Sequence, residues 1–347
     1  MEENMKKKAL ALMLCMAMFC SMFLAACGSK GETIKDDGQT TNTDTQPIEA
    51  ILGHHCADST LWQYGALKFA DLVEEYTNGG VVITVYSNGE LGDEKQLTEM
   101  TSEGTIQFSL PGSMVSTQWV SGTDVFSLPF MYESVEQAQM VLDSELGADI
   151  CSRFNEIDVQ ILGAFESGFR QLFTTKKAIN SVDDLKGLKI RVPESELYLS
   201  TWRALGASPL PMSWSEVYSS LQTGVIDGAE PPIGTGYDSQ FGEVCQNFAY
   251  VNYLYDPIFI AVNQTWLESL PEEYQDAILR AAKDAVADER IEANKRNTET
   301  EDKLVAEYKT NITHPDLAPF QQAVQSVYDN YSDQETLKSV LELLGRK

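Results

Sequence analysis

Two arginines stand in otherwise apolar stretches of the sequence. Arg191 lies in the strand-like segment 188–192, which ends at Pro193, and Arg170 follows a Gly-Phe dipeptide. A guanidinium removed from water needs an anionic partner, and its planar fork matches the two oxygens of a carboxylate. That carboxylate belongs either to a bound small molecule or to one of the 52 acidic side chains of the chain.

Motifs that mark enzyme active sites and metal sites are missing from the sequence. It contains no Gly-x-Gly-x-x-Gly, P-loop, His-Glu-x-x-His, Cys-x-x-Cys, nucleophile elbow or EF-hand loop. Only His54, His55 and His314 are available for a histidine-based triad or a zinc site. Carboxylate pairs must occur by chance among 52 acids, so they carry no information. We therefore expect a protein that is not an enzyme and has no metal and no cofactor.

Composition excludes several classes of partner. The 347 residues include 25 Lys and Arg against 52 Asp and Glu, a formal net charge of -27. Such a chain repels the phosphates of nucleic acids and does not bind anionic lipid through a basic patch. With 43% apolar residues, 14 Tyr, 14 Phe and 5 Trp, it is too apolar for a disordered acidic protein. Its length suggests about two domains.

The N-terminal residues have the pattern of a secretory signal. Lys6–Lys8 precede an uncharged, apolar stretch from 9 to 26. Leu24-Ala-Ala-Cys27 resembles the lipobox of bacterial lipoproteins, whose cysteine is lipidated and becomes the mature N-terminus. We expect residues 1–26 to be a signal peptide and Cys27 with the polar stretch up to 47 to be a lipidated, flexible tether. The alternative is a transmembrane helix, for which 18 apolar residues are near the lower limit.

Cysteine usage does not indicate a disulfide framework. After removal of the signal and lipidation of Cys27, the remaining cysteines are Cys56, Cys151 and Cys245. Because they are odd in number and far apart, buried free thiols are expected, although one disulfide pair stays possible.

Helical and strand patterns alternate along the folded part, which indicates a layered α/β protein. The first half predicts strands at 48–53, 81–86, 106–110 and 159–165 and helices at 61–76 and 93–103. The second half predicts strands at 171–174, 188–192 and 225–228 and helices at 181–184, 197–205 and 215–223.

The segment 271–308 predicts one unusually long helix. Pro271 suits a first helical turn, and neither Gly nor Pro follows until after Thr313. Apolar residues recur at helical spacing near both ends but are nearly absent between 294 and 302. At about 1.5 Å per residue the helix is about 57 Å long, more than the diameter of one domain, so we expect it to bridge two domains. The alternative is a pair of helices kinked near Asn297.

Seven stretches follow one another along the chain in a characteristic order. They are Gly89–Asp93 (GELGD), Phe126–Phe130 (FSLPF), Gly168–Arg170 (GFR), Asp183–Val192 with Pro193 (DDLKGLKIRVP), Ala204–Met212 (ALGASPLPM), Glu216–Glu230 (EVYSSLQTGVIDGAE) and Ile312–Leu317 (ITHPDL). Together they resemble the solute-binding proteins of TRAP transporters, and the resemblance extends over about residues 48–344.

The resemblance implies a fold and a domain division. The family has an α/β, two-domain fold like that of class II periplasmic binding proteins, with strands that cross between the domains and a long helix that spans both. Transferred to this chain, domain I comprises 48–167 and about 257–296, and domain II comprises 168–256 and about 297–347. Ligand lies in the cleft between the domains, which close over it by hinge motion.

The resemblance also implies the ligand contacts. Arg191 matches the family's central arginine, and Arg170 matches a second one that reaches the same acid group. The other expected contacts are Trp214, His55, Glu94, Glu230 and Phe259. The alternative for the two arginines is a structural salt bridge, and the alternative for Trp214 is a place in the core. For His55 and Glu94, a ligand contact and a structural role are equally expected.

Two departures from the family pattern narrow the ligand. The sialic-acid type has Asn after the glutamate of the Asp-Gly-x-Glu turn, but here Glu230 is followed by Pro231 and Pro232, which have no donor. That type also has an acid where this chain has Gly112. A smaller acid such as a uronate, an aldonate or a dicarboxylate fits better.

The function implied is that of an extracytoplasmic receptor, lipid-anchored at the outer face of the cytoplasmic membrane. It binds a small carboxylate and delivers it to the membrane subunits of a TRAP permease. The alternatives are a solute-binding protein of an ATP-driven importer, which a bent helix pair at 271–308 would favour, and a secreted enzyme acting on sugar acids.

Overall fold

The computed structural model describes residues 46–113 and 115–346. Residues 45–347 form one compact unit. The predicted signal peptide, Cys27 and all but the last two residues of the predicted tether lie outside the described residues. Within the described part, no helix has the length and apolar character needed to cross a membrane.

The first sheet has five strands in the order β2-β1-β3-β10-β4. They are β1 (Ile48–Gly53), β2 (Val81–Tyr86), β3 (Phe108–Ser109), β4 (Val159–Phe165) and β10 (Ile258–Asn263). β1 pairs in parallel with β2 and β3, whereas β10 is antiparallel to β3 and β4. Every residue of β10 is buried, which explains its nearly continuous apolar sequence.

The second sheet has six strands in the order β11-β9-β5-β8-β6-β7. They are β5 (Phe169–Thr174), β6 (Lys189–Val192), β7 (Ser208–Pro211), β8 (Gly228–Ala229), β9 (Asn247–Tyr255) and β11 (Asn311–Thr313). β6 pairs in parallel with β7 and β8, and β5 pairs antiparallel with β8 and β9. The carboxyl ends of β6 and β7 therefore meet at one edge of this sheet.

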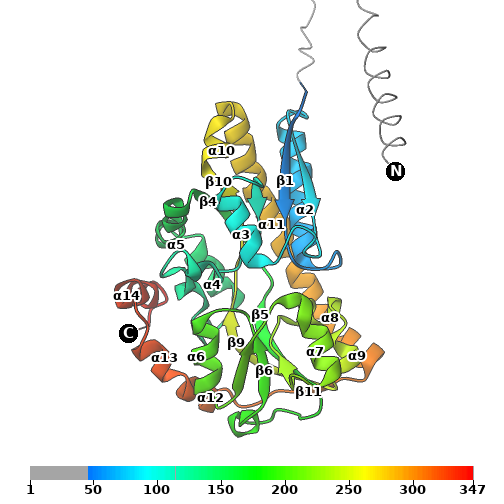
Figure 1. Cartoon of the computed structure of the whole chain (residues 1–347). Helices are drawn as coiled ribbons and strands as arrows, with labels where there is room; N and C mark the ends of the chain where they lie inside the picture. Colours follow the sequence, from blue (N-terminus) through cyan, green and yellow to red (C-terminus); the bar gives the residue numbers. More distant parts are fainter. Residues whose placement is uncertain (1–45, 114, 347) are drawn as a thin grey trace, which may run out of the picture. The chain divides into compact units, whose positions relative to one another are not determined.

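Helices cover both sheets (Figure 1). They are α2 (Leu61–Tyr76), α3 (Glu94–Ser102), α4 (Val135–Leu142), α5 (Glu145–Ser152), α6 (Glu196–Ala204), α7 (Val217–Thr223), α8 (Ile233–Asp238), α9 (Phe241–Val244), α10 (Gln264–Ser269), α11 (Glu272–Lys303), α12 (Ala318–Ala323), α13 (Gln325–Asp329) and α14 (Gln334–Leu343). α3 begins at a capping box, in which the Asp93 side chain accepts from the Gln96 N–H and the Gln96 side chain accepts from the Asp93 N–H.

Three segments connect the two sheets. Residues 166–168 join β4 to β5, and residues 256 and 257 join β9 to β10. The third connection is α11, which packs on α2 and β4 of the first sheet and then on α8 of the second (Figure 1). Any movement of one sheet against the other must involve these three segments.

Helix α11 is uninterrupted, as the sequence predicts. Its 32 residues span about 48 Å. It continues into a π-helical turn, Leu304–Tyr308, and ends at Lys309, which has a left-handed φ of 60°. The alternative of two helices kinked near Asn297 is wrong, because helical structure runs through that residue.

Most expected elements are confirmed, and two strands differ. The predicted bounds of β1, α2, β2 and β4 agree with the structure. The strand expected at 106–110 shortens to β3, which pairs over two residues with each neighbour. The strand expected at 225–228 instead begins at Gly228, because Val225 is 51% exposed and its N–H closes a turn onto the Ser220 carbonyl.

The three cysteines in the described part of the chain are free thiols, as expected. Cys56 and Cys245 are buried and Cys151 is half-buried.

The predicted domain boundaries stay a prediction. Residues near the C-terminus contact both proposed parts, since α13 packs on α6 and Asp333 pairs with Arg153 at 2.8 Å.

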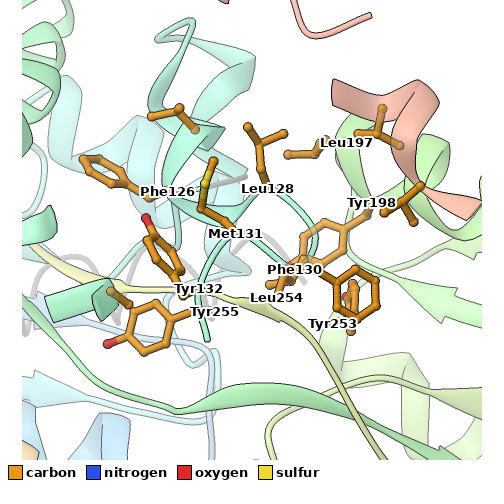
Figure 2. Close-up of a cluster of buried hydrophobic side chains, with 14 of the residues drawn as sticks. Phe126, Leu128, Phe130, Met131, Tyr132, Leu197, Tyr198, Tyr253, Leu254 and Tyr255 are labelled. Atoms are coloured by element: carbon orange, nitrogen blue, oxygen red, sulfur yellow. The ribbon is translucent and has the colours of Figure 1, made fainter. Parts of the chain in front are cut away.

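The largest apolar cluster of the described residues gathers side chains from segments far apart in the sequence (Figure 2). It packs residues of the 126–132 segment against α6 and the end of β9, with Tyr198 and Tyr253 both at 0% exposure. The hydroxyl groups of these two tyrosines nevertheless reach polar partners. The core therefore fixes the rings of Tyr198 and Tyr253, and their hydroxyl groups hydrogen-bond to Asp256 and Glu230.

Candidate functional site

A cavity of about 360 Å³ is lined by residues from both sheets. The first sheet contributes the segments that follow β1 and β2 and the start of α3. The second contributes β5, β6 and the turn that follows β7, and residue 256 comes from a crossover. Much of the wall thus lies at the carboxyl ends of strands, where open α/β sheets commonly bind ligands.

Arg191 lies in β6 and faces this cavity with 5% of its surface exposed. Its Nε and Nη2 donate to the carbonyl oxygen of Met212 at 3.0 and 2.7 Å. No ion pair in the described part of the chain includes Arg191. Burial, assisted by the charge of Arg170, lowers the pKa of Arg191 to about 10 although Glu230 opposes the change. At neutral pH it is a buried cation without a carboxylate partner, so the expected alternative of a structural salt bridge is not formed.

Trp214 lies beside Arg191. It begins the short 3-10 turn Trp214–Glu216, and the Arg191 Cζ stands 5.3 Å from its ring centroid. Its ring also packs on Phe241 at a centroid distance of 5.4 Å. The tryptophan lines the cavity, so an apolar face and a cation are presented side by side.

Arg170 also lines the cavity, but its charge is already paired. Its Nε and Nη2 donate to both oxygens of Glu230, at 2.6 and 2.9 Å, and its Nη1 lies 3.5 Å from Asp256 Oδ2. Burial alone would lower the pKa of Arg170, but Glu230, Tyr198 and Tyr253 together outweigh burial and raise it. The bidentate pair fixes the position of the Arg170 side chain in the cavity wall and largely neutralises its charge.

Glu230 itself does not line the cavity. It follows β8 with 0% exposure and also accepts a short hydrogen bond from the hydroxyl of Tyr253. Phe259 does not line it either. Successive residues of a strand face opposite sides, so Ile258 faces the cavity while Phe259 packs in the core against Phe126 and Phe154. The structure thus places these two expected ligand contacts behind the wall rather than in it.

His55 and Glu94 come from the first sheet and meet in the cavity. His55 Nε2 lies 4.0 Å from Glu94 Oε2, and its ring packs edge-on against Trp62 at 4.8 Å. Burial and the charges of His54, Arg191 and Arg170 lower the pKa of His55 to about 3. The ring is therefore neutral, and its buried Nδ1 has no hydrogen-bond partner.

Glu94 is protonated at neutral pH. Burial raises its pKa to about 8, aided by the charge of Asp256 and opposed by the hydrogen bond that the Gly112 N–H donates to Glu94 Oε1 at 2.7 Å. A neutral carboxylic acid can both donate and accept a hydrogen bond.

Asp256 is a cavity residue that the sequence reasoning missed. It lies at the crossover between β9 and β10 and accepts from the Tyr198 hydroxyl at 2.8 Å. Burial raises its pKa, although the charge of Arg170 opposes the shift. The available signal was an Asp-Pro pair between two long apolar strands, a polar interruption where a buried strand would otherwise continue.

The arrangement suits the binding of an anionic ligand. The described residues contain no group of three or more His, Cys, Asp or Glu side chains that could hold a metal. The only histidine that lines the cavity, His55, is held neutral. What the cavity offers is one uncompensated guanidinium, an indole face and several neutral hydrogen-bonding groups, which suits an anionic, hydroxylated small molecule.

Comparison with known proteins identifies the family. The model of the family described as bacterial extracellular solute-binding protein, family 7, matches residues 52–334. An uncharacterized protein of Salmonella typhimurium is 32% identical over 291 residues, which cover 83% of this chain and 89% of the relative.

Two solved structures share the fold. A TRAP periplasmic solute-binding protein of Roseobacter denitrificans with bound L-galactonate is 30% identical, with a TM-score of 0.81 over 87% of this chain and 100% of the other. One from Chromohalobacter salexigens with bound D-glucuronate is 28% identical, with a TM-score of 0.82 over 85% and 99%.

The expected fold is confirmed by these structures, including the long helix and the two-domain, class II arrangement of its two sheets. Because the family model spans most of the chain, this protein belongs to family 7 of the bacterial extracellular solute-binding proteins, the receptors of TRAP transporters.

Proposed function

We propose that the protein captures a small organic acid in the cavity and that Arg191 binds the acid's carboxylate. The observation that carries this is the state of Arg191, which is buried and charged but has no acidic partner among the described residues. A ligand carboxylate would supply the missing counter-charge. The galactonate and glucuronate bound to the two solved relatives are acids of this kind.

The remaining parts of the proposal concern delivery. The captured acid is passed to the membrane subunits of a TRAP permease, which is driven by a cation gradient rather than by ATP. The receptor is held at the outer face of the membrane by a lipid on Cys27, as the Lys6–Lys8 cluster and the Leu-Ala-Ala-Cys sequence support.

Titration calorimetry tests the carboxylate requirement. The purified full-length protein is titrated with uronates, aldonates and dicarboxylates and, as controls, with the neutral sugars of the same carbon skeletons. We expect binding of one or more acids and at least about 100-fold weaker binding of the matching neutral sugar, a difference of about 2.7 kcal/mol. Equal affinity for the neutral sugar would refute the role assigned to the carboxylate.

Fractionation tests the anchor. Expressed in a bacterial host, the wild-type protein should be recovered with membranes and incorporate labelled fatty acid, and Cys27→Ser should do neither. Because residue 27 is followed by a long polar stretch, the substitution should leave ligand affinity unchanged. Recovery of the wild-type protein in the soluble fraction, without label, would refute the anchor.

A further inference from the structure

The cavity carries its charges unevenly. At one end, Arg191 is a cation with no acidic partner in the described part of the chain. The other buried arginine, Arg170, is held bidentately by Glu230, so it does not act as a second free receptor for an anion. The buried part of the site therefore has room for one negative charge, not two.

Two acids define another part of the wall. Glu94 and Asp256 both border Gly112: a Cβ built on this glycine would lie 3.3 Å from Glu94 Oε1 and 3.2 Å from Asp256 Oδ1. Both acids line the cavity, with 19% and 15% of their side chains exposed. Because a side chain at residue 112 would be crowded by both carboxyl groups, the glycine allows Glu94 and Asp256 to approach the same backbone position.

Asp256 has acceptor capacity left for a ligand. Its one short hydrogen bond comes from the Tyr198 hydroxyl at 2.8 Å to Oδ2. Its other polar neighbours, Arg170, Ser113 and Ser127, lie at 3.4 to 3.5 Å. Two carboxyl oxygens offer about four acceptor positions, and three of the four side-chain donors that reach them are held only at these long distances, so a hydroxyl of the ligand can take the place of one of them.

Most groups near this pair are neutral and polar, and the two cations of this part of the wall are Arg170, which is already paired with Glu230, and Lys95, which is exposed. His55, Asn88, Gln118, Ser167 and Thr235 also line the cavity. Such groups hydrogen-bond hydroxyls, but they bring no cation that would neutralise a second ligand carboxylate near Asp256. A carboxylate placed there would face like charge in a partly buried site, which disfavours it.

We infer that Asp256 is a specificity determinant which, with Glu94 beside it as a hydrogen-bonding partner for ligand hydroxyls, makes the site select polyhydroxylated monocarboxylates and reject dicarboxylates. The inference rests on the proposed function, because it assumes that the ligand's first carboxylate is bound by Arg191. It divides the classes that the sequence leaves open: uronates and aldonates fit, and dicarboxylates do not.

Ligands that differ only in the second carboxylate provide the test. D-gluconate and D-glucuronate are compared with D-glucarate, and D-galactonate and D-galacturonate with galactarate, by calorimetry on the full-length protein at pH 7. In the series that binds, the monocarboxylate should bind at least about 100-fold more tightly than the dicarboxylate. A dicarboxylate that binds equally or more tightly would overturn the inference and leave the proposed function intact. Failure of every acid to bind folded protein would instead overturn the proposed function and the inference with it.

The Asp256→Asn variant distinguishes a role of Asp256 in ligand selectivity from a purely structural role. The substitution keeps the size of the side chain and an acceptor for Tyr198 but removes the charge. The ratio of monocarboxylate to dicarboxylate affinity should fall at least about tenfold, whereas a purely structural role would weaken both ligands equally and leave the ratio unchanged. Asp124→Asn is the matched control, because Asp124 accepts from the Tyr331 hydroxyl at 2.7 Å in the same way but does not line the cavity. In the Asp124→Asn variant, the ratio of monocarboxylate to dicarboxylate affinity should stay at the wild-type value.

Discussion

At the scale of single residues, the two buried arginines differ in the partners to which their guanidinium groups donate hydrogen bonds. Arg170 forms a bidentate pair with Glu230, and its loss would leave that fully buried carboxylate unpaired. Arg191 donates to a backbone carbonyl and leaves no buried acid unpaired when it is replaced. The first residue should therefore matter mainly for folding, and the second mainly for ligand affinity.

Replacing Arg191 by Gln should abolish most of the ligand affinity with little loss of stability. A bound carboxylate would lose the buried cation that has no other acidic partner, which costs about 2–5 kcal/mol or roughly 30- to 5,000-fold in Kd. Calorimetry gives the affinity, and urea unfolding gives the stability. Arg203→Gln is the control, since Arg203 is exposed and pairs with Glu196 outside the cavity. An Arg191→Gln variant with wild-type affinity would show that Arg191 does not hold the ligand.

Affinity should also depend on the protonation of Glu94. Its pKa in the folded protein, about 8, lies above the usual 4.5, so its contribution to stability is complete below about pH 4.5 and is lost as pH rises through about 8. The same ionisation adds a negative charge to the cavity, so affinity for an anionic ligand should fall between pH 7 and 9. Calorimetry across this range should show the fall in the wild type but not in Glu94→Gln. An equal fall in both would assign it to another group.

At the scale of elements, two of the three connections between the sheets share a buried polar contact. Glu289 lies on α11 with 0% exposure, and its Oε2 accepts from the Glu166 N–H at 2.9 Å. Glu166 lies in the crossover between β4 and β5. Burial raises the pKa of Glu289 well above its usual value, which favours the protonated form of the side chain that joins the helix to the crossover.

Glu289→Gln should keep this contact, and Glu289→Ala should break it. The alanine variant leaves a buried N–H without a partner, which costs about 1–3 kcal/mol of unfolding free energy, whereas the glutamine variant should be at least as stable as the wild type at pH 7. Because the folded-state pKa is raised, wild-type stability falls as pH rises through it, so the advantage of the glutamine variant should grow with pH.

Urea unfolding at pH 6 and pH 9 measures both effects. Glu299→Gln, an exposed site on the same helix, is the control and should stay within about 0.5 kcal/mol of the wild type. A glutamine variant that loses as much stability as the alanine variant would show that Glu289 is bound as a carboxylate.

At the scale of the whole molecule, the cavity wall is divided between two sheets that only three segments connect. A ligand that contacts Arg191 on one side and Glu94 on the other can favour a closed arrangement only if it makes contacts there that it lacks in an open one. The net charge of -27 does not oppose this, because the cation that meets the ligand is local and buried while the excess acid keeps the protein soluble.

Ligand binding should therefore compact the protein and stabilise it. X-ray scattering should show a smaller radius of gyration with saturating ligand. The unfolding temperature should rise as well, because ligand at 100 times its Kd adds about 2.7 kcal/mol of stability. Arg191→Gln at the same ligand concentration should show neither change. A rise in unfolding temperature without any compaction would mean that the ligand binds without closure.

Local sequence alone was enough for many of the elements and for the most informative residue. The spacing of apolar residues determines strands and helices such as β1, α2 and α11, because these patterns depend on neighbours a few positions away. The same holds for Arg191, whose apolar strand already implies burial. The ordered signatures indicated the family, which the comparisons confirm.

Contacts between distant segments were decided only by the tertiary structure. Arg170 and Glu230 are 60 positions apart, and nothing local shows that they pair across β5 and β8. Whether Phe259 faces the core or the cavity depends on the register of β10, since one position changes the face. Asp256 becomes part of the cavity only because two strands from different sheets meet there. Sequence thus determined which groups the chain carries, and packing determined which charges were left unpaired for a ligand.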